Sequence, residues 1–462
     1  MIKDTSLNQL KTGQTDFFNT GNTQSVSTRI EYLKALKRCI CAHEDEIVAA
    51  LQHDLKKPEP EIWLAEIHVT LQELKTVIKN LRTWSKPKRI TGSWLNIPSK
   101  DWIFPEPYGV TLNIAPWNYP FQLALNPIIG AVAAGNTVVL KPSEHAPKTA
   151  SILNKILSEV FPKEWVAVAQ GGPEVAKELL SFRWDYIFFT GGVSIAKIVA
   201  KAAAEHLTPT TLELGGKNPC IVDQTAKIAV SARRIVWGKF MNCGQICMSP
   251  DYVLVHQNVY TELVTAMKKE IVAMYGENPK TSPDYARLVH KGHVQKMKEL
   301  IAGQHILHGG EIDQEDRFVA PTLVALDSLD NKLMEDEIFG PILPIITYKD
   351  EEEIHQTIKH FEKPLSFYVF SQRKKWARNL MQKHSFGGGM INDVIVYFTN
   401  DKLPFGGVGH SGVGSYHGKH SFDTFTHYKP YVERPTWFDP KQRYAPFKKN
   451  FPFLKRILRL LS

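Results

Sequence analysis

From about residue 107 onward the sequence alternates short apolar runs with segments of helical spacing, and this alternation constrains the fold more than any other feature. The apolar runs lie at 109–115, 137–141, 166–169 and 184–189, and the helical segments at 120–134, 150–160 and 194–205. Apolar strands that alternate with helices are typical of a parallel sheet covered on both faces. A second series of this kind runs from about 218 to 395. We therefore predict an α/β fold with a doubly wound parallel sheet and a second α/β domain.

The chain before residue 107 follows a different pattern. Residues 24–85 carry apolar side chains at helical spacing, among them Leu33 and Leu36, so we expect helices there. Lys86-Pro87-Lys88 ends this helical block. Residues 89–106 contain aromatic residues and prolines and predict a strand-like excursion.

The composition is that of an ordinary globular protein. Of the 462 residues, 43% are hydrophobic and 22% are charged, which excludes a disordered chain and leaves room for two or three domains. Lys and Arg number 56 against 47 Asp and Glu, and the resulting charge of +9 is mostly dispersed along the chain. We interpret this excess as a solvated basic surface and expect no nucleic-acid partner.

The cysteines do not form a disulfide framework, because their number is odd and they are scattered, at Cys39, Cys41, Cys220, Cys243 and Cys247. This pattern favours a reducing compartment, and the N-terminus has no apolar run of signal-peptide length, so we expect a cytoplasmic location. No stretch holds the ~18 uninterrupted apolar residues that a membrane span needs. The richest one, 120–140, is broken by polar residues and predicts a buried helix followed by a buried strand.

A thiol, a carboxylate and a side-chain amide stand in three motifs that suit chemistry on a carbonyl group. Cys243 lies in Met-Asn-Cys-Gly-Gln-Ile-Cys, Glu213 precedes Leu-Gly-Gly-Lys, and Asn118 lies in Pro-Trp-Asn-Tyr-Pro. A cysteine attacks as the thiolate, so its free pKa of ~8.5 must fall or a base must take the proton. Glu213 is a candidate base for the thiol or for a later water. Asn118 and the backbone N–H of Cys243 are candidate donors to the oxyanion that attack creates.

Other roles for the cysteines are open at this point. Most cysteines in α/β proteins are small buried hydrophobic residues, and we assign that role to Cys39, Cys41 and Cys220. Cys243 and Cys247 have the C-x-x-x-C spacing of a metal or redox pair. Since no second Cys/His pair with the spacing of a structural zinc site stands nearby, we predict no metal site.

A candidate nucleotide site follows the apolar run at 184–189. The run leads into Thr190-Gly191-Gly192-Val193, and Ser194 is the expected N-cap of the helix that follows. A strand, a glycine turn and a helix N-terminus form an anion site that suits a pyrophosphate. Lys141 and Glu144 follow another strand end, where they could bond the two hydroxyls of a ribose. The alternative is an ordinary strand-to-helix loop.

Together these motifs resemble those of the NAD(P)-dependent aldehyde dehydrogenase superfamily. The matching motifs stand in the family's order along nearly the whole chain, at Pro116–Pro120, Lys141–Glu144, Phe189–Gly191, Glu213–Lys217, Asn242–Gln245, Glu337–Pro341 and Pro404–Gly407. Two further motifs, Asn392–Val396 and Gly414–Lys419, resemble the class 3, or fatty aldehyde dehydrogenase, branch. A set of motifs in one order is far more specific than any single one.

The resemblance implies an enzyme that oxidises an aldehyde, of medium or long chain or aromatic, to the carboxylic acid with NAD(P)+. Cys243 would attack the aldehyde, and Asn118 with the Cys243 backbone N–H would hold the oxyanion of the thiohemiacetal. Hydride transfer to the nicotinamide would leave a thioester, and Glu213 would activate the water that releases the acid. Tyr119 and His417 are expected in or behind the wall of the substrate tunnel.

The resemblance also implies a set of cofactor contacts. Lys141 and Glu144 would bind the adenosine ribose, and Gly191 and Ser194 would lie near the pyrophosphate. Glu337 and Phe339 would position the nicotinamide ribose and ring. The carboxylate of Glu144 would repel a 2′-phosphate, so NAD is expected, with NADP as the alternative. Ala196 stands where the family usually carries a second glycine that allows close helix packing near the cofactor. Its added methyl group would affect the affinity for the cofactor and the preference between NAD and NADP.

The family fold implies three parts and a homodimer. The dinucleotide-binding domain would comprise 1–85 and 107–212, and the catalytic domain 213–415. A small β bridging element used in dimer formation would comprise 86–106 and 416–446, followed by a C-terminal tail at 447–462.

The tail at 447–462 has a pattern of its own. A helix over 453–461 would place apolar residues on one face and three basic residues on the other, Lys455, Arg456 and Arg459, with Lys448 and Lys449 just upstream. A basic amphipathic helix of this kind can lie in an anionic membrane surface, although it is far too short to cross a bilayer. The alternative is that its apolar face docks on the protein's own surface or covers the partner's substrate entrance.

Three other functions stay open. An acylating relative that passes the thioester to coenzyme A, or a semialdehyde-forming one, has little use for Glu213 as a base for hydrolysis. A cofactor-free thiol hydrolase would leave the cofactor motifs without a role. A structural protein on the same fold would not need Cys243, Glu213 and Asn118 together.

Overall fold

The computed structural model describes residues 6–447 and 451–461, which fall into two compact units. The first unit comprises Met1–Trp84 and Pro107–Thr426, and the second comprises Ser85–Glu106 and His427–Ser462. Both large sheets lie in the first unit, so the division between a cofactor domain ending at 212 and a catalytic domain beginning at 213 stays a prediction.

The start of the second unit differs from the predicted bridging element. Residues 416–426 belong to the first unit, whereas the sequence predicts them in the bridge. The reason is close packing between α16 (Lys419–Thr424) and α6 (Gln122–Ala134). A Cβ atom on Gly130 of α6 would lie 2.9 Å from the carbonyl oxygen of Ser421, so only glycine permits this approach.

The first large sheet carries the predicted doubly wound pattern. Its strands stand in the order β17-β7-β6-β3-β4-β5, and all neighbours are parallel except β17 with β7. Their bounds are β3 (Val110–Ile114), β4 (Thr137–Lys141), β5 (Val166–Val168), β6 (Tyr186–Thr190), β7 (Thr210–Glu213) and β17 (Gly412–Val413). The apolar runs of the sequence are therefore buried parallel strands, and the predicted fold class is confirmed.

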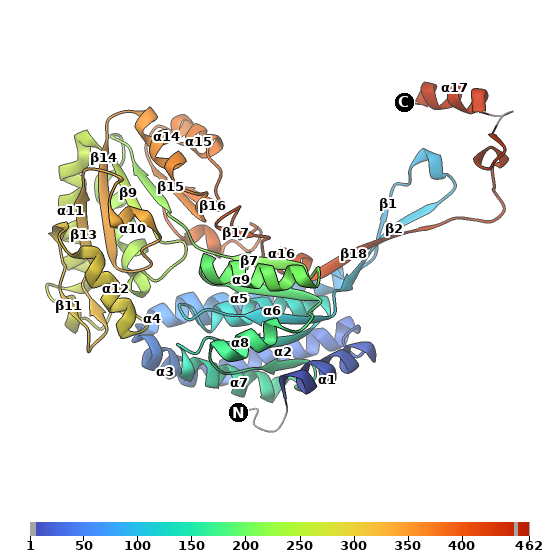
Figure 1. The fold of residues 1–462 in the computed structure, drawn as a ribbon, viewed down its shortest axis with the longest axis horizontal. Helices are drawn as coiled ribbons and strands as arrows, with labels where there is room; N and C mark the ends of the chain where they lie inside the picture. Colours follow the sequence, from blue (N-terminus) through green and yellow to red (C-terminus); the bar gives the residue numbers. More distant parts are fainter. Residues whose placement is uncertain (1–5, 448–450, 462) are drawn as a thin grey trace. The chain divides into compact units, whose positions relative to one another are not determined.

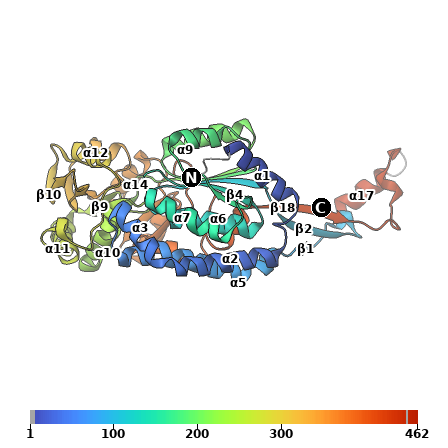
Figure 2. The same cartoon turned by 90° about the horizontal axis from the view of Figure 1, so that it is seen from below.

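Helices cover both faces of this sheet, as Figure 2 shows with the sheet nearly edge-on. On one face lie α1 (Leu7–Asn19), α8 (Pro173–Leu180) and α9 (Val193–Glu205), and on the other α2 (Val26–Ala42), α5 (His68–Trp84), α6 and α7 (Pro147–Val160). Neighbouring strand residues point to opposite faces. Val139 thus joins the core under α1 and α9, whereas Val138 and Leu140 join the core under α6 and α7.

The predicted helical block at 24–85 contains an irregular middle. After α3 (Glu44–Leu55) the chain passes Lys57 and Pro58 before α4 (Glu59–Ile62) begins. A π-helical turn at Trp63–Ile67 then leads into α5. Turns of this kind are rare in proteins as a whole, but those that occur are often found at functional sites. This one faces the cavity described below.

The second large sheet lies in the same unit and is also mostly parallel (Figure 1). Its order is β10-β13-β14-β9-β8-β15-β16, with only β10 antiparallel to its neighbour. The strands are β8 (Pro219–Val222), β9 (Tyr252–His256), β10 (His305–His308), β13 (Thr322–Leu326), β14 (Ile342–Tyr348), β15 (Ser366–Phe370) and β16 (Gly388–Ile391). The accompanying helices are α10 (Ile228–Phe240), α11 (Tyr260–Tyr275), α12 (Lys291–Ile301), α13 (Lys332–Glu335), α14 (Glu351–His360) and α15 (Lys374–Lys383). A separate two-stranded sheet is formed by β11 (Ile312–Asp313) and β12 (Phe318–Val319).

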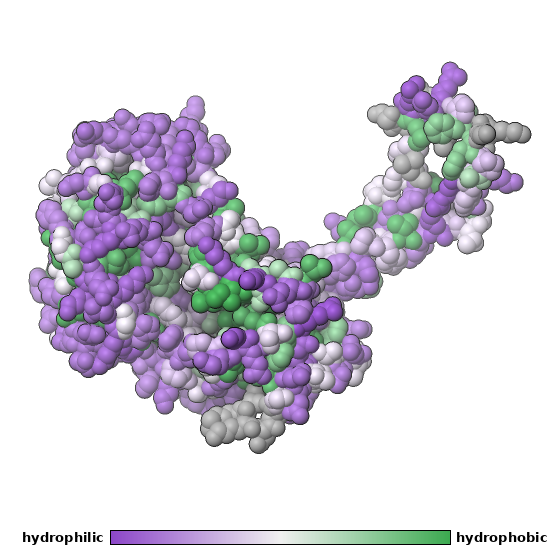
Figure 3. Space-filling model, in the orientation of Figure 1, coloured by the Kyte–Doolittle hydropathy of each residue, from purple (hydrophilic) through white to green (hydrophobic). Residues whose placement is uncertain are grey.

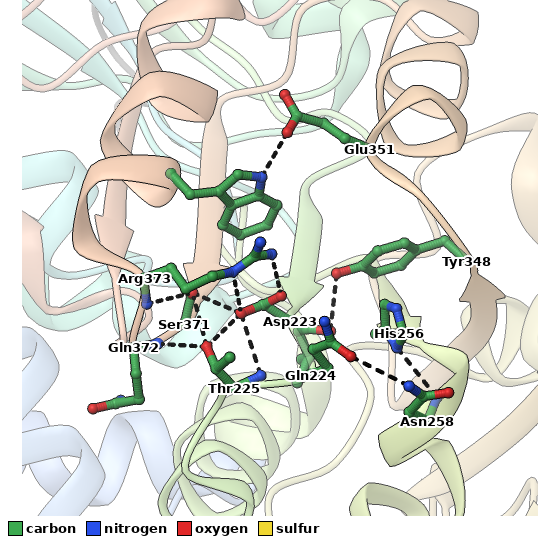
Figure 4. A network of polar contacts seen from close by, with 12 residues as sticks. Asp223, Gln224, Thr225, His256, Asn258, Tyr348, Glu351, Ser371, Gln372 and Arg373 are labelled. Carbon is green, nitrogen blue, oxygen red and sulfur yellow. Dashed lines mark hydrogen bonds and ion pairs between the residues drawn. The ribbon is translucent and has the colours of Figure 1, made fainter.

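A polar network closes the carboxyl edge of the second sheet, and Figure 4 shows it from close by. Asp223 follows β8 and is fully buried, and its carboxylate lies 2.5 Å from a guanidinium nitrogen of Arg373. The hydroxyls of Thr225 and Ser371 donate to the same carboxylate, at 2.5 and 2.8 Å. Burial alone would raise the pKa of Asp223, but these donors outweigh it and hold the pKa below its ordinary value.

The second unit consists of a small sheet and a terminal helix. Its sheet has the order β1-β2-β18, formed by β1 (Lys88–Ile90), β2 (Lys100–Pro107) and β18 (Thr426–Glu433). Large apolar side chains are exposed in this unit, as Figure 3 shows, and include Ile90, Trp94, Ile97, Phe104, Tyr431 and Val432.

The tail forms the helix α17 (Phe451–Leu461). Lys448 and Lys449 of the predicted basic tail lie outside the described residues. Across the described segments of the chain, we find no helix with the length and apolar character that a membrane span requires.

Candidate active site

A cavity of about 1100 Å³ in the first unit brings together most of the residues singled out in the sequence. Its lining includes Asn118, Gly191, Ser194, Glu213, Glu337 and Phe339, and also Tyr119 and His417. Glu213 ends β7 and His417 follows β17, and the other residues come from the segments that follow β3 and β6 and from the loop before β14. Ligands bind in open parallel sheets outside the carboxyl ends of the strands, so this position agrees with the general rule.

Asn118 joins the first large sheet to the cysteine-containing loop. The residue is buried in the turn between β3 and α6, and its Nδ2 donates to the carbonyl of Gln245 at 3.1 Å. The side chain of Asn242 donates back to the carbonyl of Asn118 at 2.8 Å. These two bonds hold the amide of Asn118 against the loop at Met241–Cys247.

The structure places Cys247, and not Cys243, at this cavity. Cys247 lines the same cavity as Asn118 and Glu213, whereas Cys243 is fully buried and does not line it. The Sγ of Cys243 instead donates to the hydroxyl of Tyr285 at 3.5 Å, in the interior beneath the loop. The prediction that Cys243 meets Asn118 and Glu213 is therefore not supported by the geometry.

The backbone of the loop explains this difference. The helix α10 ends at Phe240, and Asn242 and Cys243 then adopt left-handed conformations with φ of 49° and 55°. These dihedrals turn the chain sharply and direct the Cys243 side chain inward, so the next cysteine reaches the cavity. Both cysteines stand in one short motif, and no periodicity extends through an irregular turn, so the sequence offered no signal that separates them.

Glu213 ends β7 and is one of the residues that line the cavity. The residue is buried, and within the described part of the chain neither carboxylate oxygen has a hydrogen-bond partner. Burial raises the pKa of Glu213 well above its ordinary value. A buried carboxyl without partners is costly unless a ligand or water completes it, so this residue marks a binding position.

The thiol of Cys247 is protonated at neutral pH in this state of the molecule. Burial, and then the charges of Glu337 and Glu213, raise the pKa of Cys247 to about 12. The backbone N–H groups of Cys247 and Met248 oppose the rise, which places two donors beside the sulfur. Attack by Cys247 therefore requires that a base accept its proton.

The glycine turn after β6 lies on the cavity wall as expected, but the predicted N-cap is wrong. The helix α9 begins at Val193 with Gly192 as its N-cap, so Ser194 lies inside the first turn. Gly191, Gly192 and Ser194 all line the cavity. The buried hydroxyl of Thr190, just before them, has no hydrogen-bond partner among the described residues. The N–H groups at the start of a helix and an unpartnered hydroxyl suit a bound anion.

Glu337 and Phe339 line another part of the wall. A Cβ atom on Gly215 would lie 2.2 Å from a carboxylate oxygen of Glu337, so glycine is required where this carboxylate approaches. Burial, and then Asp251, raise the pKa of Glu337 to about 8. Phe339 meets Trp117 edge to face, with ring centroids 5.5 Å apart.

Comparison with known proteins identifies the family. The sequence profile described as the Aldehyde dehydrogenase family matches residues 14–431. A Staphylococcus aureus protein named 4,4'-diaponeurosporen-aldehyde dehydrogenase is 44% identical over 445 residues, covering 96% of this chain and 97% of the relative. The chain belongs to the aldehyde dehydrogenase family.

Two further matches agree with the predicted branch and fold. Aldehyde dehydrogenase family 3 member A2 from Macaca fascicularis is 44% identical and covers 89% of this chain and 85% of the relative. A solved structure of Staphylococcus aureus AldH in a substrate-bound state superimposes with a TM-score of 0.96 at 43% identity, covering 98% of this chain and 99% of the other. The resemblance to the class 3 branch is thereby confirmed. This protein is an oxidoreductase that oxidises an aldehyde with NAD(P).

The cavity of this family member fits a dinucleotide on its own evidence. Within the described residues, the hydroxyl of Thr190 and the carboxyl of Glu213 have no hydrogen-bond partner, so this polar part of the wall lacks the groups that a ligand would supply. The carboxylate of Glu337 approaches the backbone closely at Gly215. Lys141 ends β4 on the same sheet edge, and its Nζ lies 2.6 Å from a Glu144 oxygen. Neither residue lines the cavity itself, so their contact with a ribose stays a prediction.

A separate cluster has the residue types of a metal site. Cys39 on α2, His43 between α2 and α3, and Glu159 on α7 offer ligand atoms within 4.8 Å of one another. The ring of His43 already lies 2.8 Å from Glu46 and 3.0 Å from Glu159, so ion pairs account for this arrangement. None of these residues lines the catalytic cavity.

Proposed function

We propose that Cys247 is the nucleophile that attacks the aldehyde carbon. Its position on the wall of the cavity that Asn118 also lines is the single observation that supports this assignment over Cys243. The amide of Asn118 and the backbone N–H of Cys247 would hold the oxyanion of the thiohemiacetal. A fixed donor of this kind contributes on the order of 10²–10³ in rate.

Glu213 serves as the base in this proposal. Glu213 lines the cavity that contains Cys247, so its carboxylate can activate the water that attacks the thioester, while the thiol proton passes to solvent before the aldehyde is attacked. Water attack on the thioester at Cys247 releases the carboxylic acid and the free thiol. A base placed for hydrolysis disfavours the acylating alternative, in which coenzyme A removes the acyl group.

Most of the residues that would hold the dinucleotide line the same cavity. Gly191 and Ser194 at the start of α9 suit the pyrophosphate, and Glu337 and Phe339 suit the nicotinamide ribose and ring. Lys141 and Glu144 would bond the adenosine ribose. When bound, NAD(P)+ supplies the hydride acceptor for the oxidation. The carboxylate of Glu144 disfavours a 2′-phosphate, which supports NAD over NADP.

A lipophilic aldehyde is the proposed substrate class. Apolar and aromatic side chains make up much of the cavity wall, among them Leu64, Trp237, Met241, Ile246, Met274 and Tyr275. The Staphylococcus aureus relative is named for 4,4'-diaponeurosporen-aldehyde. Both observations support aldehydes of medium or long chain, or aromatic ones.

The proposal is tested by NAD(P)H formation at 340 nm with aldehydes from acetaldehyde to hexadecanal and with benzaldehyde, each with NAD and NADP. We expect kcat/KM to rise with chain length and activity to vanish in Cys247→Ala. Full activity in Cys247→Ala, or no activity with any aldehyde from protein that binds NAD, would contradict the assignment.

We further propose a homodimer. The exposed Ile195 and Ile198 on α9 and, separately, the exposed apolar side chains of the β1-β2-β18 sheet are surfaces that a partner would cover. A dog relative is named dimeric and NADP-preferring. Sedimentation of Ile195→Asp/Ile198→Asp should show monomers, while Val230→Asp, at an exposed position on α10, should stay dimeric. Dimers in both variants would remove α9 from the interface.

The location we propose is the cytoplasm, with peripheral membrane contact through residues 447–462. Five free cysteines favour a reducing compartment. The helix α17 carries Lys455, Arg456 and Arg459, which suit an anionic lipid surface. Vesicles containing anionic lipid should retain the full chain but not a variant that lacks 447–462 or one with glutamine at the three basic positions. Equal retention of all three would contradict membrane contact.

A further inference from the structure

A buried ion pair lies behind the turn that carries Asn118. The side chains of Lys57 and Glu66 are 1% and 0% exposed, and the Nζ of Lys57 lies 2.5 Å from Oε1 of Glu66. Removing two charges from water costs several kcal/mol per ion, so such a pair is weak evidence for stability alone. The groups that it holds in place are more informative.

Lys57 holds the carbonyl of the oxyanion donor. Its Nζ donates to the carbonyl oxygen of Asn118 at 2.8 Å and lies 3.8 Å from the centre of the Tyr119 ring. The same carbonyl oxygen accepts from Asn242 in the cysteine-containing loop. One backbone atom of Asn118 is thus fixed from the α4 side and from the loop side together.

Glu66 holds the other end of the same turn. Its second oxygen accepts from the backbone N–H groups of Phe121 and Gln122, both at 3.0 Å. The helix α6 begins at Gln122 and has no side-chain cap of its own, so Glu66 satisfies N–H groups that would otherwise lie unpaired in the core. A carboxylate at a helix N-terminus is also favoured by the helix dipole.

We propose that the Lys57–Glu66 pair is a positioning device for the amide of Asn118. The pair joins the π-helical turn before α5 to both ends of the Asn118–Gln122 turn and so fixes where Nδ2 of Asn118 meets the substrate oxygen. Lys57 and Glu66 act through Asn118 and touch no substrate; neither lines the cavity. The inference rests on the proposed role of Asn118.

The test is a double-mutant cycle of Lys57→Met with Asn118→Ala, read as the single-turnover rate of NAD(P)H formation. Asn118→Ala should lower this rate by about 10²–10³-fold. Lys57→Met should lower it by about 10²-fold through misplacement of the donor, with NAD(P)+ affinity unchanged. In the Asn118→Ala background, Lys57→Met should cost almost nothing more, because the donor is already gone.

Two further variants keep the test decisive. Glu66→Gln retains an acceptor for the α6 N–H groups but not the charge, so it should fold and show the same non-additivity with a smaller loss. Arg373→Met breaks the ion pair to buried Asp223 at the other sheet and should leave the rate unchanged. Equal losses from Lys57→Met in both backgrounds, or an equal loss in Arg373→Met, would overturn the positioning role alone. An unchanged rate in Asn118→Ala would overturn both the role of Asn118 and the inference built on it.

Discussion

The carboxyl edges of the two large sheets are built from similar residues but completed differently. At the second sheet the buried Asp223 accepts from Arg373, Thr225 and Ser371. At the first sheet the buried Glu213 has no donor to either oxygen within the described residues. Burial raises the pKa of Glu213, whereas its donors hold the pKa of Asp223 below the ordinary value.

This difference separates a structural carboxylate from a functional one. Native proteins pair nearly all of their buried polar groups, so an unpaired one marks a place where a ligand or reacting group belongs. The cavity lies at the first edge, and Cys247, Asn118, Thr190 and Glu213 all line it. The second edge is complete in itself, and we assign it to stability.

The largest expected effect concerns the two cysteines of the loop. Cys247→Ala should reduce kcat by on the order of 10⁴-fold or more, as loss of a covalent nucleophile does in other enzymes. Cys243→Ala, which removes a buried sulfur, should retain kcat within about tenfold and lower thermal stability instead. Steady-state NAD(P)H formation measures kcat and thermal unfolding measures stability in each variant. NAD(P)+ binding serves as the control for folding. The reverse pattern would show that the cavity geometry misassigns the nucleophile.

Glu213→Gln should have the next largest effect. A general base contributes about 10²–10⁴-fold, so kcat should fall by that amount while a first burst of NAD(P)H survives. In the parent enzyme the active form of Glu213 is the carboxylate, and burial raises its pKa above 4.5. Turnover should therefore rise with pH through a midpoint above 4.5, and stopped-flow traces across pH should show this rise lost in the variant. A pH profile identical in both would remove Glu213 from the mechanism.

The smallest effect on turnover is expected at the second edge. Arg373→Met should leave kcat unchanged and destabilise the fold by about 1–3 kcal/mol, the cost of removing donors from a buried carboxylate. Because the folded-state pKa of Asp223 is lowered, its contribution is present above the unfolded pKa of about 3.9 and is lost as pH falls through the folded value. The stability gap between parent and variant, measured by denaturant unfolding, should therefore narrow in acid. A reduced kcat with unchanged stability in Arg373→Met would show that the carboxyl edge of the second sheet also serves catalysis, contrary to the assignment made above.

The sequence predicts the sheets well because burial on both faces leaves a local signal. The apolar runs at 137–141 and 184–189 became β4 and β6, and the helices expected between the strands are present. The motifs also placed Asn118, Gly191 and Glu213 at one cavity, since strand ends of a parallel sheet meet at one edge, and Glu337 reaches the same cavity from the loop before β14.

The remaining features depend on geometry that no local pattern contains. The choice between Cys243 and Cys247 follows from two left-handed residues in an irregular turn. The N-cap of α9 falls at Gly192 and not at Ser194, because the chain enters the helix two residues earlier than its first polar side chain indicates. Lys57 reaches Asn118 across 61 positions of sequence, a contact that only the packed core creates.

The most direct test of the central claim is to locate the acyl group on the enzyme. Glu213→Gln should accumulate the thioester when mixed with NAD(P)+ and a long-chain aldehyde, and fragment-ion mass spectrometry of the peptide that spans Cys243 and Cys247 can assign it. The account predicts an acyl mass on Cys247 and an unmodified Cys243. An acyl group on Cys243 would contradict the assignment of the active site.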